Sequence, residues 1–188
     1  MRKDFYLFRH GETDYNREGR TQGCRIDVGL NDKGKAQALV LAERLRSVRL
    51  EKIFSSPLIR ALQTAETVDA YHHVGIEVID DLREGCYGRI EGLTREEADA
   101  LYPGMLDLWH GREMSDLRFK EGESRPEMAQ RFHRAFEQMI AAPYRTVAVA
   151  SHGGVMWAFL KTLGWHEEFI DNCSCYHLIY EDGRFRRE

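Results

Sequence analysis

Short apolar runs alternate with longer amphipathic stretches along most of this chain. Strands are predicted at residues 5–8, 52–55, 76–79 and 146–150, and the first and last of these are almost wholly apolar, as expected for strands buried on both faces. The stretches between them carry apolar residues at helical spacing, so strands and helices alternate. This order predicts an α/β fold, a three-layer sandwich around a mainly parallel central sheet.

Local signals place the ends of several elements. Four helix starts are marked by capping residues: Asn31, Ser56 with Pro57, Thr94 with Glu97, and Ser124 with Glu127. Another helix is expected after the strand at 146–150, with Val155 and Phe159 on its buried face. Near the C-terminus, residues 176–180 and the chain from Phe185 onward are predicted to form a hairpin across Asp182-Gly183. That hairpin would add an antiparallel edge to the sheet.

At 188 residues the chain is long enough for one well-packed core, so we expect a single domain spanning 1–188. Periodicity weakens between residues 86 and 122, and we interpret this stretch as a lid over a site; it is called the lid segment below. Leu106, Leu108 and Trp109 are its expected apolar anchors. The polar loop at 11–29 is long for a compact domain, which is typical of a functional loop.

Charge and composition limit the possible partners. Lys plus Arg number 27 and Asp plus Glu number 31, which gives a net charge of −4, and no block of like charge is present. This pattern favours neither a nucleic-acid nor a membrane partner, so any anion site must come from a few converging residues. The chain lacks an apolar run of membrane-spanning length and a signal-like N-terminus, and we therefore expect a cytoplasmic protein.

The cysteines are Cys24, Cys86, Cys173 and Cys175. One residue separates the last two, which is not the spacing of a zinc site, and there is no second close pair. A disulfide framework is typical of short secreted chains, which this chain does not resemble. The expectation is therefore four free thiols.

Charged and nucleophilic residues follow two of the predicted strands. Arg9-His10-Gly11 follows the first, and Ser151-His152-Gly153-Gly154 follows the strand at 146–150. Ligands of open α/β sheets bind beyond the carboxyl ends of the strands. Arg60 lies in the first turn of a predicted helix, and Glu84 follows the third strand. Guanidinium groups bind phosphate oxygens, a neutral histidine is a competent nucleophile, and a carboxylic acid can protonate a leaving group.

Taken in order, these motifs resemble the histidine phosphatase superfamily, also called the phosphoglycerate mutase-like group. The resemblance extends from residue 5 to the last hairpin. It is carried by the following residues: Arg9-His10-Gly11-Glu12-Thr13, Asn16, Ser56-Pro57-Leu58, Arg60-Ala61, Gln63-Thr64-Ala65, Glu84, Gly88, Glu91-Gly92 and His152-Gly153.

The resemblance implies a role for each matching residue. His10 is expected to accept the phosphoryl group, while Arg9, Arg60 and His152 hold its oxygens. The substrate-binding residues are expected to be Asn16, Gln22 and Gly153. Glu84 is the expected proton donor, with Glu12 and Glu91 as the other carboxylates close to the site. No cofactor is implied. A metal site at His10 and His152 would need a further ligand, and no carboxylate or third histidine has the sequence spacing typical of one.

The leading hypothesis is metal-independent hydrolysis of phosphomonoesters through a phosphohistidine, with a small phosphorylated metabolite as the partner. Two alternatives stay open: a phosphoglycerate mutase-type transfer, and a non-catalytic protein that binds phosphorylated ligands. The compact lid segment favours a phosphatase over a mutase. Where many family members have a small residue or arginine, this chain has Trp157, a departure that bears on the substrate. The apolar residues Leu106, Trp109 and Met114 suggest a partly apolar leaving group, and the sequence does not define the oligomeric state.

Overall fold

The structure is a computed structural model that describes residues 2–111, 114–167 and 169–188. Its centre is a six-stranded sheet in the order β3-β2-β4-β1-β5-β6. The strands are β1 (Arg2–Arg9), β2 (Lys52–Ser55), β3 (Ile76–Val78), β4 (Thr146–Ser151), β5 (Cys175–Glu181) and β6 (Arg184–Arg187). The first four pair in parallel, whereas β5 and β6 are antiparallel to their neighbours. The predicted mainly parallel sheet with an antiparallel edge is therefore confirmed.

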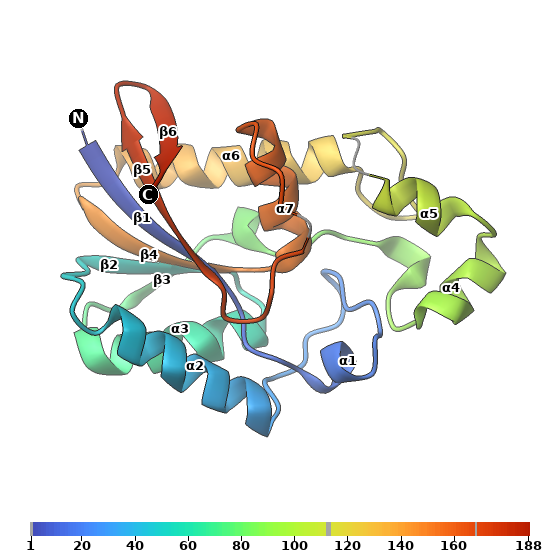
Figure 1. The fold of residues 1–188 in the computed structure, drawn as a ribbon, viewed down its shortest axis with the longest axis horizontal. Coiled ribbons are helices and arrows are strands. Elements are labelled where there is room, and N and C mark those ends of the chain that lie inside the picture. Colours follow the sequence, from blue (N-terminus) through green and yellow to red (C-terminus); the bar gives the residue numbers. More distant parts are fainter. Residues whose placement is uncertain (1, 112–113, 168) are drawn as a thin grey trace.

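Helices cover both faces of this sheet (Figure 1). One face packs against α2 (Asp32–Leu45) and α3 (Ile59–His72), and the other against α6 (Arg125–Ala141) and α7 (Gly153–Thr162). Successive residues of a strand point to opposite faces, and in β1 Leu7 joins the core under α6 and α7 whereas Phe8 joins the core under α2 and α3. This arrangement explains why the first strand is apolar without alternation.

The start of α3 differs from the prediction. The helix begins at Ile59, and its N-cap is Leu58, which makes no side-chain capping bond. Ser56 is not the cap, because its hydroxyl accepts the Leu58 N–H at 3.2 Å and lies 2.7 Å from Nε2 of His152. The serine that precedes the proline therefore serves the site rather than the helix. The other predicted caps, Asn31, Thr94 and Ser124, are confirmed.

The lid segment contains a 3-10 helix, η2 (Gly88–Ile90), and two short α-helices, α4 (Arg95–Leu101) and α5 (Met105–His110). Leu106 and Trp109 are buried as predicted. The prediction was wrong for Leu108, whose side chain is 69% exposed on the outer side of α5. Residues 112 and 113 of this segment lie outside the described residues, and closure of the segment over a site stays a prediction.

Two further elements complete the chain. The 3-10 helix η1 (Asp80–Leu82) leads from β3 toward Glu84, and the loop at 11–29 contains a one-turn helix, α1 (Asp14–Arg17), that was not predicted.

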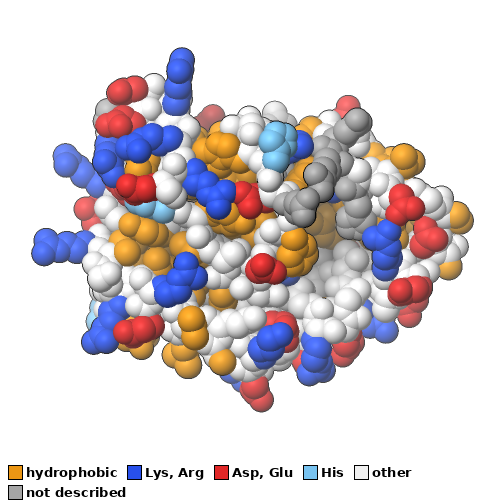
Figure 2. Space-filling model, viewed as in Figure 1, with side chains coloured by type: hydrophobic (Ala, Val, Ile, Leu, Met, Phe, Trp, Pro, Cys, Tyr) orange, Lys and Arg blue, Asp and Glu red, His pale blue; other side chains and the backbone are white. Residues whose placement is uncertain are grey.

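On the face in Figure 2, Lys and Arg side chains are interspersed with Asp and Glu, without a field of one sign. Within the described ranges, we find no helix with the length and apolarity needed to cross a bilayer.

Cys24 and Cys86 form a disulfide, and their Cα atoms lie 4.7 Å apart. The expectation of four free thiols was therefore wrong for this pair and right for Cys173 and Cys175. A sequence separation of 62 residues gives no sign of the pairing. Only the fold brings the loop at 11–29 against the chain that follows Glu84.

Loss of this disulfide is expected to destabilise the protein. Closing a loop of this length lowers the entropy of the unfolded chain, an effect of at most about 4 kcal/mol in the chain-entropy account. Urea denaturation of the double variant C24S/C86S should show a lower free energy of unfolding. Cys175→Ser is the control, because Cys175 is a free cysteine whose burial raises its thiol pKa to about 12. Equal unfolding midpoints for the double variant and the wild type would contradict this prediction.

Candidate active site

The two histidine motifs meet because β1 and β4 are adjacent and parallel. Arg9 is paired in register with Ser151, so the residues that follow, His10 and His152, leave the sheet side by side. Their ring centroids are 5.1 Å apart. Arg60, the second residue of α3, is fully buried at the same edge of the sheet. The structure thus brings together four residues that the sequence spreads over more than 140 positions.

His10 is held in one orientation by its own loop. Its Nδ1 lies 2.6 Å from the carbonyl oxygen of Gly11, so Nδ1 carries the proton and donates it to that oxygen. In this tautomer Nε2 keeps its lone pair. Burial lowers the pKa of His10 well below its ordinary value of 6.5, and the nearby Arg9 and Arg60 lower it further. The ring is therefore neutral at neutral pH, as a nucleophile must be.

The two arginines are anchored through one end of their guanidinium groups. Nη1 of Arg9 donates to the carbonyl of Ile170 at 2.6 Å, while Arg60 donates to the carbonyls of Ile26 and Gly23, each at 2.8 Å. The Nε atom of each arginine is buried without a partner among the described residues. Buried donors nearly always have an acceptor, so these two indicate a place for an anion.

His152 supplies a third nitrogen of this kind. Ser56 accepts a hydrogen bond from the backbone, so its own hydroxyl proton is available to Nε2 of His152, 2.7 Å away. This assigns the ring proton to Nδ1, which is buried and has no partner within the part of the chain that the structure describes. Burial, followed by the field of Arg60, lowers the pKa of His152 well below 6.5. A neutral His152 can thus donate one hydrogen bond to an anion.

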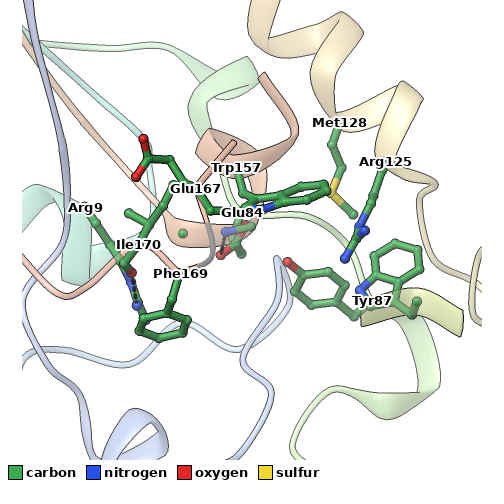
Figure 3. Close-up of a pocket in the computed structure, with 12 residues that line it drawn as sticks. Arg9, Glu84, Tyr87, Arg125, Met128, Trp157, Glu167, Phe169 and Ile170 are labelled. Atoms are coloured by element: carbon green, nitrogen blue, oxygen red, sulfur yellow. Dashed lines mark hydrogen bonds between the residues drawn. The ribbon is translucent and has the colours of Figure 1, made fainter. Parts of the chain in front are cut away.

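Glu84 is oriented by backbone amides. Its Oε1 accepts the N–H groups of Gly85 and Val155 at 2.8 and 2.9 Å, and its Oε2 accepts that of Gly154 at 3.1 Å. Two of these donors belong to the first turn of α7, where free N–H groups favour a carboxylate. The carboxyl group lines the same cavity as Arg9 (Figure 3).

The other two candidate carboxylates serve different purposes. Glu12 forms an ion pair with Lys33 at 2.6 Å and accepts a hydrogen bond from Asn31. Glu91 accepts the backbone N–H groups of Arg25 and Tyr87 at 2.9 and 2.8 Å. Neither lines the cavity beside Arg9, which favours Glu84 as the proton donor.

Two of the predicted substrate-binding residues, Asn16 and Gln22, lie in the loop after His10, and the third, Gly153, directly follows His152. Asn16 accepts a hydrogen bond from the backbone N–H of Thr13 through its amide oxygen, and Gln22 accepts one from the Thr13 hydroxyl in the same way. Both therefore keep an NH₂ group as the donor end. Gly153 lies against Arg9, because a Cβ placed there would be 3.3 Å from Nε of that arginine. Because a side chain at position 153 would crowd the guanidinium of Arg9, glycine suits this position.

A cavity of about 410 Å³ extends from Arg9 and Glu84 outward. Figure 3 shows Glu84 and Tyr87 directed into it, with Trp157 on one side. It is lined by Arg9, Glu84, Tyr87, Trp109, Arg125, Met128, Gly153, Gly154, Trp157, Glu167, Phe169 and Ile170. Sequence reasoning missed Tyr87, Arg125 and Phe169, although Tyr87 lies between the family residues Glu84 and Gly88 and Arg125 follows the helix cap Ser124. Of the three apolar residues expected near the leaving group, Trp109 lines the cavity, whereas Leu106 and Met114 do not.

Acidification is expected to weaken the fold because His10 and His152 are buried and neutral. Below pH 6.5 an unfolded histidine binds a proton, whereas these two do not until the pH is much lower. The free energy of unfolding should therefore fall as the pH drops through 6.5, by roughly 2 kcal/mol in total between pH 7 and 5.5. Urea denaturation across this range should show a flatter dependence for H10Q/H152Q. A parallel dependence in both proteins would contradict the prediction.

No group of three or more His, Cys, Asp or Glu side chains in the described ranges is arranged to hold a metal ion.

Comparison with known proteins adds independent information about the site. The family model described as "Histidine phosphatase superfamily (branch 1)" matches residues 5–188. This match begins at the first strand and includes every residue placed in the site above.

Individual proteins agree with the family match. The uncharacterized phosphatase PhoE of Bacillus subtilis is 33% identical over 97% of this chain and 88% of its own length. The probable phosphoglycerate mutase GpmB of Salmonella arizonae is 32% identical over 96% of this chain and 86% of its own. A structure of mycobacterial glucosyl-3-phosphoglycerate phosphatase in complex with VO3 has a TM-score of 0.86 at 30% identity, covering 100% of this chain and 97% of that one. Because these matches include almost the entire sequence, the protein belongs to the histidine phosphatase superfamily.

Proposed function

We propose that this protein hydrolyses small phosphate monoesters without a metal ion, through a phosphohistidine formed on His10. That the chain is a phosphatase enzyme follows from its family and from the phosphatases among its relatives. The observation that carries the detailed proposal is the environment of His10. A neutral imidazole with a free Nε2 lies among three buried nitrogens, on Arg9, Arg60 and His152, that have no partner in the described part of the chain.

In the first step, Nε2 of His10 attacks phosphorus, an N–P bond forms and the ester P–O bond breaks. Charge spreads over the three equatorial oxygens of the transferring group. The Nε–H groups of Arg9 and Arg60 and the Nδ1–H of His152 are suited to bind those oxygens. Because these donors are anchored before the substrate arrives, they need little reorganisation during the reaction.

Glu84 acts as an acid in the first step and as a base in the second. It gives a proton to the leaving oxygen as the P–O bond breaks, and then takes a proton from the water that attacks the phosphohistidine. The N–P bond breaks, inorganic phosphate leaves and His10 regains its lone pair. The backbone N–H groups of Gly154 and Val155 support this role by fixing where the carboxyl oxygens lie.

A phosphoglycerate mutase is the second candidate, favoured by the similarity to GpmB. It would share the first step and return the phosphoryl group to the bound intermediate instead of to water. A purely ligand-binding protein is less well supported, since the proposed nucleophile His10 and the proposed acid Glu84 are both in place.

Three assays test the proposal. Turnover of p-nitrophenyl phosphate should persist in excess EDTA, and 3-phosphoglycerate should yield inorganic phosphate or remain unchanged. Loss of activity with EDTA that a divalent ion restores would overturn the metal-independent mechanism. Efficient formation of 2-phosphoglycerate would establish the mutase instead. Binding without turnover across a panel of sugar phosphates, phosphoglycerates and nucleotides would establish the ligand-binding protein.

A further inference from the structure

Trp157 has a defined place in the cavity. It follows Gly153 and Gly154 by four and three residues on α7, so all three share one face of the helix. The N–H groups of Gly154 and Val155 that hold Glu84 lie in the first turn of the same helix. The indole is fixed by a hydrogen bond of 2.9 Å from its Nε1 to the carbonyl of Glu167. The ring therefore lies about one helical turn after the amide of Gly154 and lines the same cavity as the proposed proton donor.

A buried arginine, Arg125, packs against two of the indole rings that line the cavity. The guanidinium of Arg125 lies 4.1 Å from the ring centroid of Trp157 and 5.0 Å from that of Trp109. Nη1 of the same arginine donates to the carbonyl of Gly111 at 2.8 Å. Cation–π contacts of this kind are stronger away from water, and Arg125 is buried. Two indoles from different elements are thereby held in place around one cation.

Tyr87 and Phe169 extend the aromatic surface. The ring of Tyr87 packs edge-on to Trp109, with centroids 5.9 Å apart, and its hydroxyl abuts Gly154. Phe169 is 69% exposed although its ring lies beside the guanidinium of Arg9, 5.6 Å away. An exposed aromatic ring next to a cavity gains apolar contact when a ligand covers it. Aromatic rings therefore line the cavity both beside Arg9 and around Arg125 (Figure 3).

We propose that this aromatic wall, made of Tyr87, Trp109, Trp157 and Phe169, selects phosphate esters whose leaving group carries an aromatic ring. The inference rests on the proposed function and names the substrate class of the same site. With the phosphoryl group at His10 and the ester oxygen at Glu84, the leaving group extends into the cavity. A ring there stacks on aromatic surface that a small polyol or carboxylate leaves uncovered. The volume of about 410 Å³ is in the range of pockets that enclose ring-sized ligands.

The test compares two esters of similar intrinsic reactivity, 2-phenylethyl phosphate and ethyl phosphate, by phosphate release. Both leave as primary alkoxides, so the ratio of their kcat/KM values isolates the binding of the ring. The wild type should prefer the phenyl ester by about 10- to 100-fold, the effect of burying a ring of this size. Trp157→Leu should reduce the ratio by about 3- to 10-fold, while Trp157→Phe, which keeps a ring, should retain most of it.

Trp165→Leu is the matched control, because Trp165 is also a partly buried indole but does not line the cavity. Both esters are assayed with the same enzyme preparation. A smaller folded fraction of a variant therefore lowers both kcat/KM values equally and leaves their ratio unchanged. A wild-type ratio near one, an unchanged ratio in Trp157→Leu, or faster turnover of glycerol phosphate than of the phenyl ester would overturn the inference while leaving the phosphatase proposal intact.

Binding gives a readout that does not depend on turnover. Calorimetry with 2-phenylethylphosphonate and ethylphosphonate should show the same preference and the same loss in Trp157→Leu. Failure to hydrolyse either ester would overturn the proposed function alone, since the phosphonates still report on the wall. Equal phosphonate affinities in the wild type would overturn the aromatic subsite whatever the enzyme hydrolyses.

Discussion

Replacing His10 with alanine is expected to abolish turnover. No other group in the described part of the site combines a free lone pair with a position among Arg9, Arg60 and His152. The expected loss is on the order of 10⁵–10⁶-fold, comparable to removing the nucleophile of a serine protease. Initial rates with p-nitrophenyl phosphate measure this loss directly.

Chemical trapping identifies the intermediate. Acid quench with labelled substrate should show a base-stable, acid-labile phosphoenzyme in the wild type and none in His10→Ala. His133→Ala is a suitable control because His133 lies on α6 and contacts Thr162, outside the cavity. An acid-stable phosphoenzyme would contradict the assignment and point to a serine or threonine nucleophile.

Replacing Glu84 with glutamine should separate the two halves of the reaction. An alkyl ester needs a proton on its leaving oxygen, so its turnover should fall by roughly 10²–10⁴-fold, the usual range for general acid–base catalysis. p-Nitrophenolate leaves with little help, so the first step with that substrate should largely persist. Hydrolysis of the phosphohistidine should then stall, because no base activates the water. The expected signature is a burst near one product per site with an accumulated phosphohistidine.

The structure adds a requirement for interpreting this variant. Oε2 of Glu84 accepts the Gly154 N–H, and an amide NH₂ in that position would face another donor. Binding of inorganic phosphate should therefore be measured in parallel to show that the cationic end is intact. Glu12→Gln serves as the control, since Glu12 pairs with Lys33 away from the cavity. Equal slowing on both ester types without a burst would refute the acid–base role of Glu84.

Much of the fold was predictable because local patterns and tertiary packing agree. The run from Phe5 to Phe8 has no polar alternation, and in the structure β1 is covered on both faces. The capping residues Asn31, Thr94 and Ser124 acted as expected, since each satisfies an N–H within its own helix. Ser56 failed as a cap because a tertiary partner, His152, lies against its hydroxyl.

Part of the site was predictable because two of its motifs directly follow predicted strands. Arg9-His10 and His152 each end a predicted strand, and parallel neighbours present their carboxyl ends at one edge, so their meeting followed from the pattern. The choice of Glu84 over Glu12 and Glu91 was open in the sequence. Contacts distinguish them: only Glu84 lines the cavity, held there by the first turn of α7.

The sequence by itself therefore determined the α/β class, the family and the residues proposed to bind and transfer phosphate, because these depend on short motifs and on periodicity. The tertiary structure alone decided the Cys24–Cys86 disulfide and the aromatic wall of Tyr87, Trp109, Trp157 and Phe169. Those features join segments far apart in the chain, and no local rule relates them. The residues proposed to act on phosphate lie in short motifs that can be recognised one by one, whereas the side chains that surround the leaving group carry no such motif.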